Sequence, residues 1–361
     1  MKTEKIFYNG RMIGSIRYSF FNEEEEEEYQ MEKENLLQII YPPTISWSME
    51  WQRPHHILRQ FAKHGFNAFF VDPNLHSMIQ IEENFFITNS LSYFRYNKQN
   101  ILYLTLPIPD LCNEIPYKIL WYDIVDDEEI FNHIKNFKDQ HQEMILKADI
   151  VTVSAKKLLE RNLKYREDIL YLPNACDWDL FSKVSIEKKN NKRIGFIGSL
   201  GHWLDYDLID YCLKELNDYN FIFIGRIYTD KLNDQVEKLK ENKNFIYEGV
   251  KSFHSLPSYL EQIDICIIPF KKNKITDAVS PIKLFEYYAS GKLVVSTYFD
   301  EIKNFPFLLI ARNKKEFVKQ IQRSFAKVED VDLRKQIREI AKEESWNNRF
   351  HKIFPKIMEK I

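Results

Sequence analysis

One short stretch of the chain combines a proline, a lysine and a glutamate at spacings that fit anion and ribose binding. Pro281 suits the first turn of a helix, and Ser280 before it is a residue type that caps helices. The free N–H groups of that turn would hold a diphosphate, and Lys283 adds a positive charge there. Glu286 follows on the same helical face, where its carboxylate would accept from ribose hydroxyls. The same residues also fit an ordinary capped helix with a surface lysine–glutamate pair.

A pair of acidic residues follows the strand expected at 119–123. Asp126 or Asp127 would serve as a general base that deprotonates an acceptor hydroxyl. The alternative is that both residues only cap a helix. The pair therefore predicts either a catalytic carboxylate or a structural turn.

A second polar group opens the helix expected at 53–64. Trp51, Arg53 and His55 stand there, and an arginine at such a place would bind an anionic acceptor. The basic residues of this helix also fit either a solvated face or a contact with anionic lipid headgroups. They are Arg53, His55, His56, Arg59, Lys63 and His64.

Short apolar runs alternate with amphipathic stretches through most of the chain. Strands are expected at 36–40, 68–72, 101–104, 119–123, 150–153 and 169–174, then at 193–197, 221–224, 245–247, 265–268 and 293–296. Helices between successive strands imply parallel sheets that are covered on both faces. We therefore expect an α/β chain of two doubly wound, Rossmann-like domains facing a cleft, in which ligands bind at the carboxyl ends of the strands.

Changes in composition predict the borders of these domains. A hairpin signal around Asn9-Gly10 and an acidic run precede the first strand, and a Lys-, Asn- and Glu-rich linker spans 182–193. The expected segments are an appendage at 1–35, an acceptor domain at 36–185, a donor domain at 190–330 and closing helices at 331–361, which would cross back to the first domain.

Composition excludes several classes of protein. The 361 residues carry 51 Lys+Arg against 53 Asp+Glu, so a net charge of -2 argues against nucleic acid as the main partner. The 4 cysteines form no CxxC pair, which indicates reduced thiols and neither a disulfide framework nor a zinc site. No apolar run is long enough to span a membrane, so we expect a cytoplasmic protein.

The stretch from Val279 to Ser296 resembles the donor-binding motif of glycosyltransferases with the GT-B fold. The likeness is greatest to family 4 and to bacterial transferases of the teichuronic-acid type. Other motifs resemble the same family in the same order, and the resemblance covers about residues 36–350. They are Trp51–His56, Tyr122–Asp127, Leu172–Asp177 and Gly195–Asp205.

The resemblance implies a transferase that moves a sugar from a nucleotide-diphosphate sugar, with UDP favoured, to a hydroxyl acceptor. That acceptor would be a glycan or a lipid-linked sugar in cell-surface polysaccharide synthesis, and no cofactor or metal is expected. Donor binding is implied for Gly198, Ser199, Gly201, Trp203, Arg226, Val250, Lys251, Val279, Ser280, Pro281, Lys283 and Glu286. Acceptor binding is implied for Trp51, Arg53 and His55, and catalysis for Asp126 or Asp127.

The chain departs from that family pattern in three places. The loop at 44–50 has no glycine, and Ala278 stands where many members carry a second glutamate. Where many members carry an arginine and a lysine, this chain has Ser199, His202 and Trp203. Both a retaining reaction and an inverting reaction with an aspartate base are therefore open.

Two other functions fit parts of the sequence. The departures would suit a non-catalytic nucleotide- or glycan-binding protein on the same fold. Gly195, Gly198 and Gly201 invite a dinucleotide-binding oxidoreductase, but their spacing does not match that fingerprint. Three scattered Asp-x-Asp pairs are more typical of caps than of a metal site.

Overall fold

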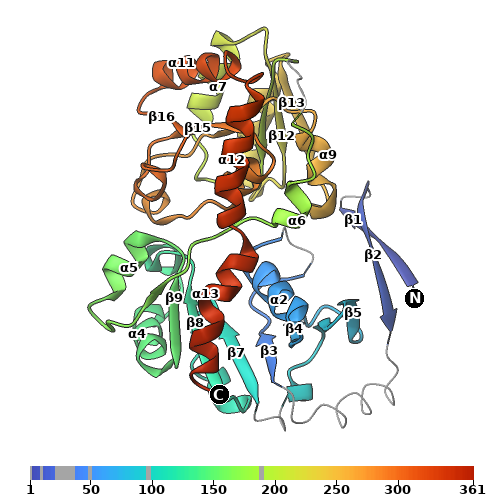
Figure 1. Ribbon diagram of the computed structural model, residues 1–361, viewed down its shortest axis with the longest axis vertical. Coiled ribbons are helices and arrows are strands. Elements are labelled where there is room, and N and C mark those ends of the chain that lie inside the picture. Colours follow the sequence, from blue (N-terminus) through green and yellow to red (C-terminus); the bar gives the residue numbers. More distant parts are fainter. Residues whose placement is uncertain (1, 9–10, 21–36, 48–50, 95–98, 187–190) are drawn as a thin grey trace. The chain divides into compact units, whose positions relative to one another are not determined.

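The computed structural model describes residues 2–8, 11–20, 37–47, 51–94, 99–186 and 191–361. The chain divides into two compact units (Figure 1). Unit 1 comprises Met1–Pro173 and Trp346–Ile361, and unit 2 comprises Asn174–Ser345. The crossing after Pro173 differs from the expected domain end at 185. The chain returns to unit 1 after Ser345. Of the closing helices predicted at 331–361, only the last one therefore belongs to unit 1.

Unit 1 is built on a ten-stranded sheet in the order β1-β2-β5-β6-β4-β3-β7-β8-β9-β10. Its parallel strands are β6 (Phe85–Thr88), β4 (Asn67–Val71), β3 (Gln38–Tyr41), β7 (Asn100–Leu104), β8 (Ile119–Ile124), β9 (Ile150–Val153) and β10 (Leu170–Tyr171). The chain winds outward from β3 in both directions, so the strand order reverses between β3 and β7. Ligands of doubly wound sheets bind outside the carboxyl ends of the strands at such a point.

An antiparallel edge completes this sheet. The predicted N-terminal hairpin forms as β1 (Lys2–Tyr8) and β2 (Arg11–Phe20), and β2 pairs with β5 (Ile79–Glu82). The predicted acidic run at 23–28 lies outside the described residues, as does part of the predicted linker, 187–190.

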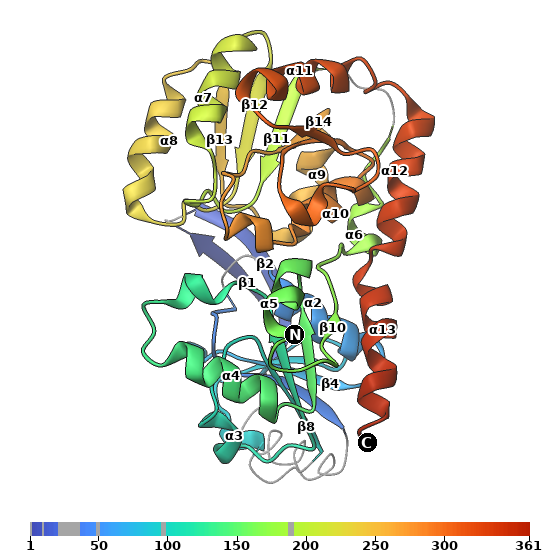
Figure 2. The same cartoon turned by 90° about the vertical axis from the view of Figure 1, so that its left-hand side faces the viewer.

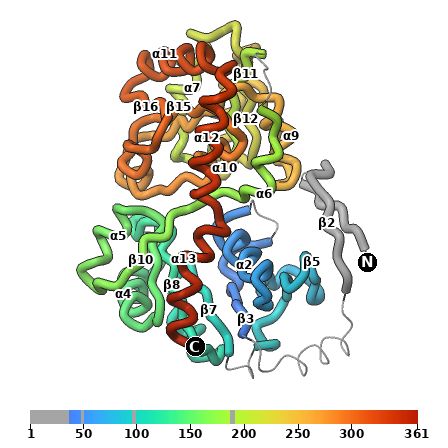
Figure 3. Tube along the Cα trace, viewed as in Figure 1, coloured from blue at the N-terminus to red at the C-terminus, as the bar shows by residue number. Residues whose placement is uncertain are grey.

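The helices of unit 1 include the one that carries the predicted acceptor residues. They are α2 (Arg53–Lys63), α3 (Leu111–Glu114), α4 (Phe137–Lys147), α5 (Lys156–Asn162) and α13 (Trp346–Met358). Figure 3 shows the red C-terminal helix among the blue-to-green segments of this unit. His56 of α2 stacks on Trp346 of α13 at 4.9 Å between ring centroids, and His64 stacks on Phe350 at 3.8 Å.

The basic face predicted for α2 is therefore largely inside unit 1. Arg53, His55 and His56 are buried, whereas Lys63 and His64 are exposed. A contact of the whole basic face with lipid headgroups is wrong, because α13 covers part of this face. No helix of the described ranges has the length and apolar character needed to cross a bilayer.

Unit 2 is built on a six-stranded, all-parallel sheet in the order β13-β12-β11-β14-β15-β16. The strands are β11 (Arg193–Ile197), β12 (Asn220–Ile224), β13 (Phe245–Gly249), β14 (Ile265–Ile268), β15 (Leu293–Thr297) and β16 (Leu309–Ala311). The order reverses between β11 and β14, so the loops after these two strands flank the expected ligand position.

Helices connect and cover this second sheet (Figure 2). They are α6 (Trp178–Phe181), α7 (Tyr206–Glu215), α8 (Asn233–Lys240), α9 (Leu256–Leu260), α10 (Ile282–Ala289), α11 (Lys314–Phe325) and α12 (Val331–Glu343). α11 packs on β15, β16 and α7, whereas α10 packs on α12 and β15. α10 connects β14 to β15 and begins at the carboxyl edge of the sheet.

Candidate functional site

The loop after β11 is fixed at the point where the strand order of unit 2 reverses. On one side, the Leu200 N–H donates to the Arg226 carbonyl at 2.7 Å. On the other side, the Lys271 N–H donates to the Trp203 carbonyl at 2.7 Å. These backbone hydrogen bonds extend the sheet beyond its strands, so the loop has little freedom to move.

Gly198 and Lys283 meet at this edge. Gly198 has φ +146°, a conformation that favours glycine, and a Cβ added to it would overlap Cε and Nζ of Lys283. Gly225 has φ +144°, and a Cβ there would overlap the Gly198 carbonyl. The lysine of α10 therefore lies directly against the glycine loop after β11. The structure brings together two sequence motifs that were predicted separately to bind the donor.

Glu286 lies one turn further along α10 and is buried, with 8% of its surface exposed. Burial raises the pKa of its carboxyl to about 7, against an opposing effect of Lys283 and with a further increase from Asp177. Asp177 is itself buried and caps α6 by accepting from the Leu180 N–H at 3.2 Å. A carboxyl in this state is suited to hydrogen bonds with hydroxyl groups.

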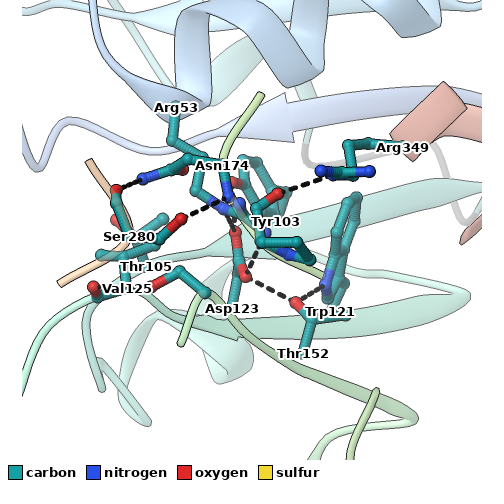
Figure 4. Close-up of polar contacts among 12 residues, drawn as sticks. Arg53, Tyr103, Thr105, Trp121, Asp123, Val125, Thr152, Asn174, Ser280 and Arg349 are labelled. Atoms are coloured by element: carbon teal, nitrogen blue, oxygen red, sulfur yellow. Dashed lines mark hydrogen bonds and ion pairs between the residues drawn. The ribbon is translucent and has the colours of Figure 1, made fainter. Parts of the chain in front are cut away.

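Ser280 has a different role from the predicted helix cap. α10 begins at Ile282 with Pro281 as its N-terminal cap residue, and no side chain caps it. The Ser280 hydroxyl oxygen accepts from the Asn174 N–H at 3.2 Å, and the Ser280 carbonyl accepts from Asn174 Nδ2 at 2.6 Å (Figure 4). The prediction that Ser280 caps the helix is wrong because the hydroxyl is directed to another loop.

The other predicted donor residues occupy the same carboxyl edge at different strands. Trp203 is half-buried, lies over Gly201, and meets Tyr228 edge-to-face at 5.1 Å between ring centroids. Lys251 pairs with Glu248 at 3.1 Å. Lys251 is half-buried like Trp203, and so are Ser199, Arg226, Val250 and Val279. Val250 and Lys251 follow β13, the edge strand, so they lie farther along the sheet from Gly198.

Arg53 of unit 1 is not open to an acceptor. It is only 3% exposed, and its Nε and Nη2 donate to the two Asp123 oxygens at 2.6 and 3.0 Å. Tyr103 and Thr152 hydroxyls also donate to Asp123, at 2.7 and 2.5 Å (Figure 4). The guanidinium of Arg53 is therefore engaged inside the unit by a buried carboxylate and is not presented to an acceptor in this structure.

His55 is also buried, among aromatic rings. It stacks on Trp51 at 5.6 Å and on Phe70 at 4.8 Å between ring centroids. Its Nδ1 accepts from the Gln52 N–H at 3.1 Å, while burial lowers its pKa to about 3. His55 therefore stays neutral and supports the start of α2. The buried side chain of His55 has no exposed surface that could make the predicted contact with an acceptor.

Trp51 keeps part of its surface exposed, and it has a neighbour that sequence reasoning missed. Trp47 packs against Trp51 with 5.8 Å between ring centroids. The backbone N–H of Trp47 donates to Asp72 Oδ2 at 2.8 Å. Both tryptophans are half-buried and follow β3, at the reversal point of unit 1. The sequence does point to this loop, because residues 44–50 lack the glycine that many family members carry there. That departure was the signal that could have drawn attention to Trp47.

The two predicted catalytic carboxylates differ in their surroundings. Asp127 is buried, accepts from the Glu129 N–H at 2.9 Å and forms an ion pair with Arg161. It acts as a cap, as the structural alternative predicted. Asp126 is exposed beside it. Asp126 is thus the better candidate for a base.

Several important residues were quoted in motifs without receiving a role. Asn174 and Asp177 both belong to the Leu172–Asp177 motif, and Asp123 belongs to the Tyr122–Asp127 motif. Their contacts join segments far apart in the sequence, which spacing alone cannot show. Within the described residues, no group of three or more His, Cys, Asp or Glu side chains could hold a metal ion.

Comparison with known proteins finds a family match for the part of the chain that contains this edge of unit 2. Residues 191–327 match the family described as glycosyl transferases group 1. This segment is therefore similar to the glycosyl transferases group 1 domain. It contains the glycine loop, Lys283 and Glu286, so the match includes the edge of unit 2 described above.

Sequence and structure comparisons extend over both units. TuaH of Bacillus subtilis (strain 168), named for teichuronic acid biosynthesis as a glycosyltransferase, is 27% identical over 237 residues. That match covers 61% of this chain and 59% of TuaH, so the chain matches under two thirds of the relative's length. Sucrose-phosphate synthase from Thermosynechococcus elongatus has a TM-score of 0.70 at 11% identity, covering 90% of this chain and 100% of the other.

A third comparison involves a protein solved with a nucleotide sugar. HepE of Anabaena, in complex with UDP-glucose, has a TM-score of 0.62 at 12% identity, covering 89% of this chain and 99% of that protein. These likenesses show that the chain has the GT-B fold of glycosyltransferases. The predicted fold class is confirmed.

Proposed function

We propose that the chain is a glycosyltransferase that moves a sugar from a nucleotide-diphosphate sugar to a hydroxyl acceptor. The observation that carries the proposal is the contact of Lys283 with Gly198 at the reversal point of the parallel sheet in unit 2. It combines a glycine backbone without a side chain, a helix N-terminus and a cation, which together suit a diphosphate. The group 1 match over residues 191–327 supports the same reaction class.

In this proposal, unit 2 supplies electrostatic stabilisation to the leaving group. Negative charge develops on the diphosphate as the bond to the sugar breaks, and Lys283 with the first turn of α10 would offset it. Glu286 would bind the ribose hydroxyls. The complex of HepE with UDP-glucose supports a UDP-sugar as donor.

Deprotonation of the acceptor is proposed for unit 1. Asp126 is exposed after β8 and would take the proton from the acceptor hydroxyl. A base on the protein suits an inverting reaction, and a retaining reaction stays the alternative. Asp127 contributes by fixing this turn through Glu129 and Arg161.

The acceptor that we propose is a glycan or lipid-linked sugar in cell-surface polysaccharide synthesis. The naming of TuaH for teichuronic acid biosynthesis supports this class. We also propose a cytoplasmic location with peripheral contact at the inner face of the membrane. At the C-terminal end of α2, Lys63 and the following His64 are exposed, and they would contribute to such a contact.

The proposed activity is tested by a screen of nucleotide sugars. Purified chain is incubated with each donor and a panel of hydroxyl acceptors, and NMR determines the anomer of any product. We expect transfer by the wild type and a loss of at least about tenfold in kcat/KM for Glu286→Ala. Glu237→Ala, an exposed glutamate on α8, is the matched control and should retain activity.

A non-catalytic binding protein is the second candidate. The ion pair of Asp127 with Arg161 favours it, because this carboxylate is already engaged. Nucleotide binding without transfer or donor hydrolysis in the same screen would support this candidate against the enzyme.

A further inference from the structure

The loop that precedes α10 in unit 2 is hydrogen-bonded to the point where the chain enters that unit. Asn174 is the first residue of unit 2, directly after Pro173. Its backbone and side-chain N–H groups donate to the hydroxyl and carbonyl oxygens of Ser280 at 3.2 and 2.6 Å (Figure 4). A single asparagine thus holds both polar oxygens of the residue that precedes Pro281.

These contacts fix one peptide group. The Ser280–Pro281 peptide is planar, so a hydrogen bond to its carbonyl sets the orientation of the whole group. The proline ring restricts the next dihedral, and Pro281 has φ -78°. The hydrogen bond to the Ser280 carbonyl and the ring of Pro281 together therefore determine the direction in which α10 starts. Lys283 and Glu286 both stand on this helix, and both are proposed to contact the donor.

Asn174 is itself held in place. Two residues later, the Cys176 N–H donates to the Glu344 carbonyl at 3.0 Å, and Cys176 forms a parallel bridge with Ser345. On the unit 1 side of the crossing, the Pro173 carbonyl accepts from Arg349 Nε at 2.9 Å. Asn174 is consequently a fixed support for the loop.

We infer that Asn174 is a positioning residue for donor binding, acting through Ser280 on the start of α10. The inference deepens the proposed function and rests on it. A preorganised loop avoids the cost of ordering when the nucleotide binds, so loss of the support should weaken binding. Of the two contacts with Ser280, the one to its carbonyl at 2.6 Å should matter more than the one to its hydroxyl at 3.2 Å, because the carbonyl belongs to the peptide group that leads into α10.

The test compares Asn174→Ala with a matched asparagine elsewhere in unit 2. Asn244 also donates from Nδ2 to backbone carbonyls, those of Leu213, Leu216 and Tyr219, at 3.1, 3.1 and 3.0 Å. It precedes β13 at the amino edge of the sheet, away from the loop that precedes α10. Asn244→Ala therefore removes the same kind of contact without touching α10.

Calorimetry with UDP gives the main readout. We expect Asn174→Ala to weaken the dissociation constant about fivefold, the loss of one net hydrogen bond. Asn174→Ser, which keeps a hydroxyl donor, should fall between Asn174→Ala and the wild type, and Ser280→Ala should stay close to the wild type. Asn244→Ala should lower the melting temperature but leave the UDP dissociation constant unchanged.

Hydrogen exchange without nucleotide separates this inference from the proposed function. Amides of residues 284–286, the first hydrogen-bonded amides of α10, should exchange faster in Asn174→Ala than in Asn244→Ala. Wild-type exchange at these amides in Asn174→Ala, or equal UDP affinity of Asn174→Ala and the wild type, would overturn the inference. Faster exchange in a chain whose wild type binds no nucleotide would support the loop contact and contradict the donor site.

Discussion

At the scale of single residues, the motif side chains divide into those that we propose to bind a ligand and those that hold elements together. Arg53 and Asp123 come from two separate motifs and form one buried ion pair. Lys283 and Glu286 share a helix with an open N-terminus. A residue type at a given spacing is thus compatible with either role, and burial decides between them.

The buried ion pair of unit 1 gives the first prediction. Removal of one partner leaves an uncompensated charge in the interior, so Arg53→Met should lower the free energy of unfolding by about 3–5 kcal/mol. Arg59→Met is the control, because Arg59 pairs with the half-buried Glu82 nearer the surface, and it should cost under about 1 kcal/mol. Urea unfolding followed by circular dichroism measures both. Equal costs for the two variants would contradict the buried role of Arg53.

Glu286 gives a prediction about pH. Its folded pKa of about 7 lies above the ordinary value of 4.5, so between these pH values the folded chain keeps a proton that the unfolded chain releases. Its contribution to stability is therefore complete below pH 4.5 and is lost as pH rises through about 7.

Glu286→Gln should remove this part of the pH dependence. The difference in the free energy of unfolding between variant and wild type should change by up to about 3 kcal/mol across the window. Chemical denaturation at a series of pH values measures it, with the exposed Glu237→Gln as control. Parallel curves for Glu286→Gln and the wild type would show that the carboxyl is not shifted.

At the scale of elements, the proposed donor edge depends on the close approach of the loop after β11 to the Lys283 side chain of α10. Gly198→Ala should weaken UDP binding by at least about tenfold, because the added methyl displaces Lys283 and the backbone has φ +146°. Gly65→Ala is the matched control: it has φ +87° but no atom near the added Cβ, so it carries only backbone strain. Calorimetry should show unchanged UDP affinity for Gly65→Ala. An equal loss in both variants would contradict the contact of loop and helix.

At the scale of the whole molecule, the alternation of strands and helices predicted both doubly wound sheets. It did so because buried parallel strands are continuous apolar runs, such as Ile119–Ile124. The crossing at Pro173 could not be predicted, since the composition changes later, at the Lys-rich segment after Phe181. The last helix belongs to unit 1, where Trp346 stacks on His56, a residue far from it in the sequence.

The candidate site could be predicted only in part, for the same physical reason. Lys283 and Glu286 were identified because a helix fixes their mutual spacing. The contacts of Asn174 with Ser280 and of Arg53 with Asp123 depend on how distant segments pack, so their roles required the structure.

Metal dependence is a property of the complete reaction. We predict that sugar transfer is unchanged by excess EDTA, because Lys283 and the start of α10 would supply the positive charge that a divalent ion supplies elsewhere. The screen of nucleotide sugars, repeated with EDTA and with added Mg²⁺, measures this. Loss of transfer with EDTA that Mg²⁺ restores would contradict it.

The central claim is that the edge formed by Gly198 and Lys283 binds the diphosphate of a nucleotide sugar. Calorimetric titration of UDP into the wild type, Lys283→Ala and the exposed control Lys314→Ala tests it most directly. We predict binding by the wild type and by Lys314→Ala, and an affinity lower by at least about tenfold for Lys283→Ala. Absence of UDP binding by the wild type, or equal binding by all three chains, would contradict the claim.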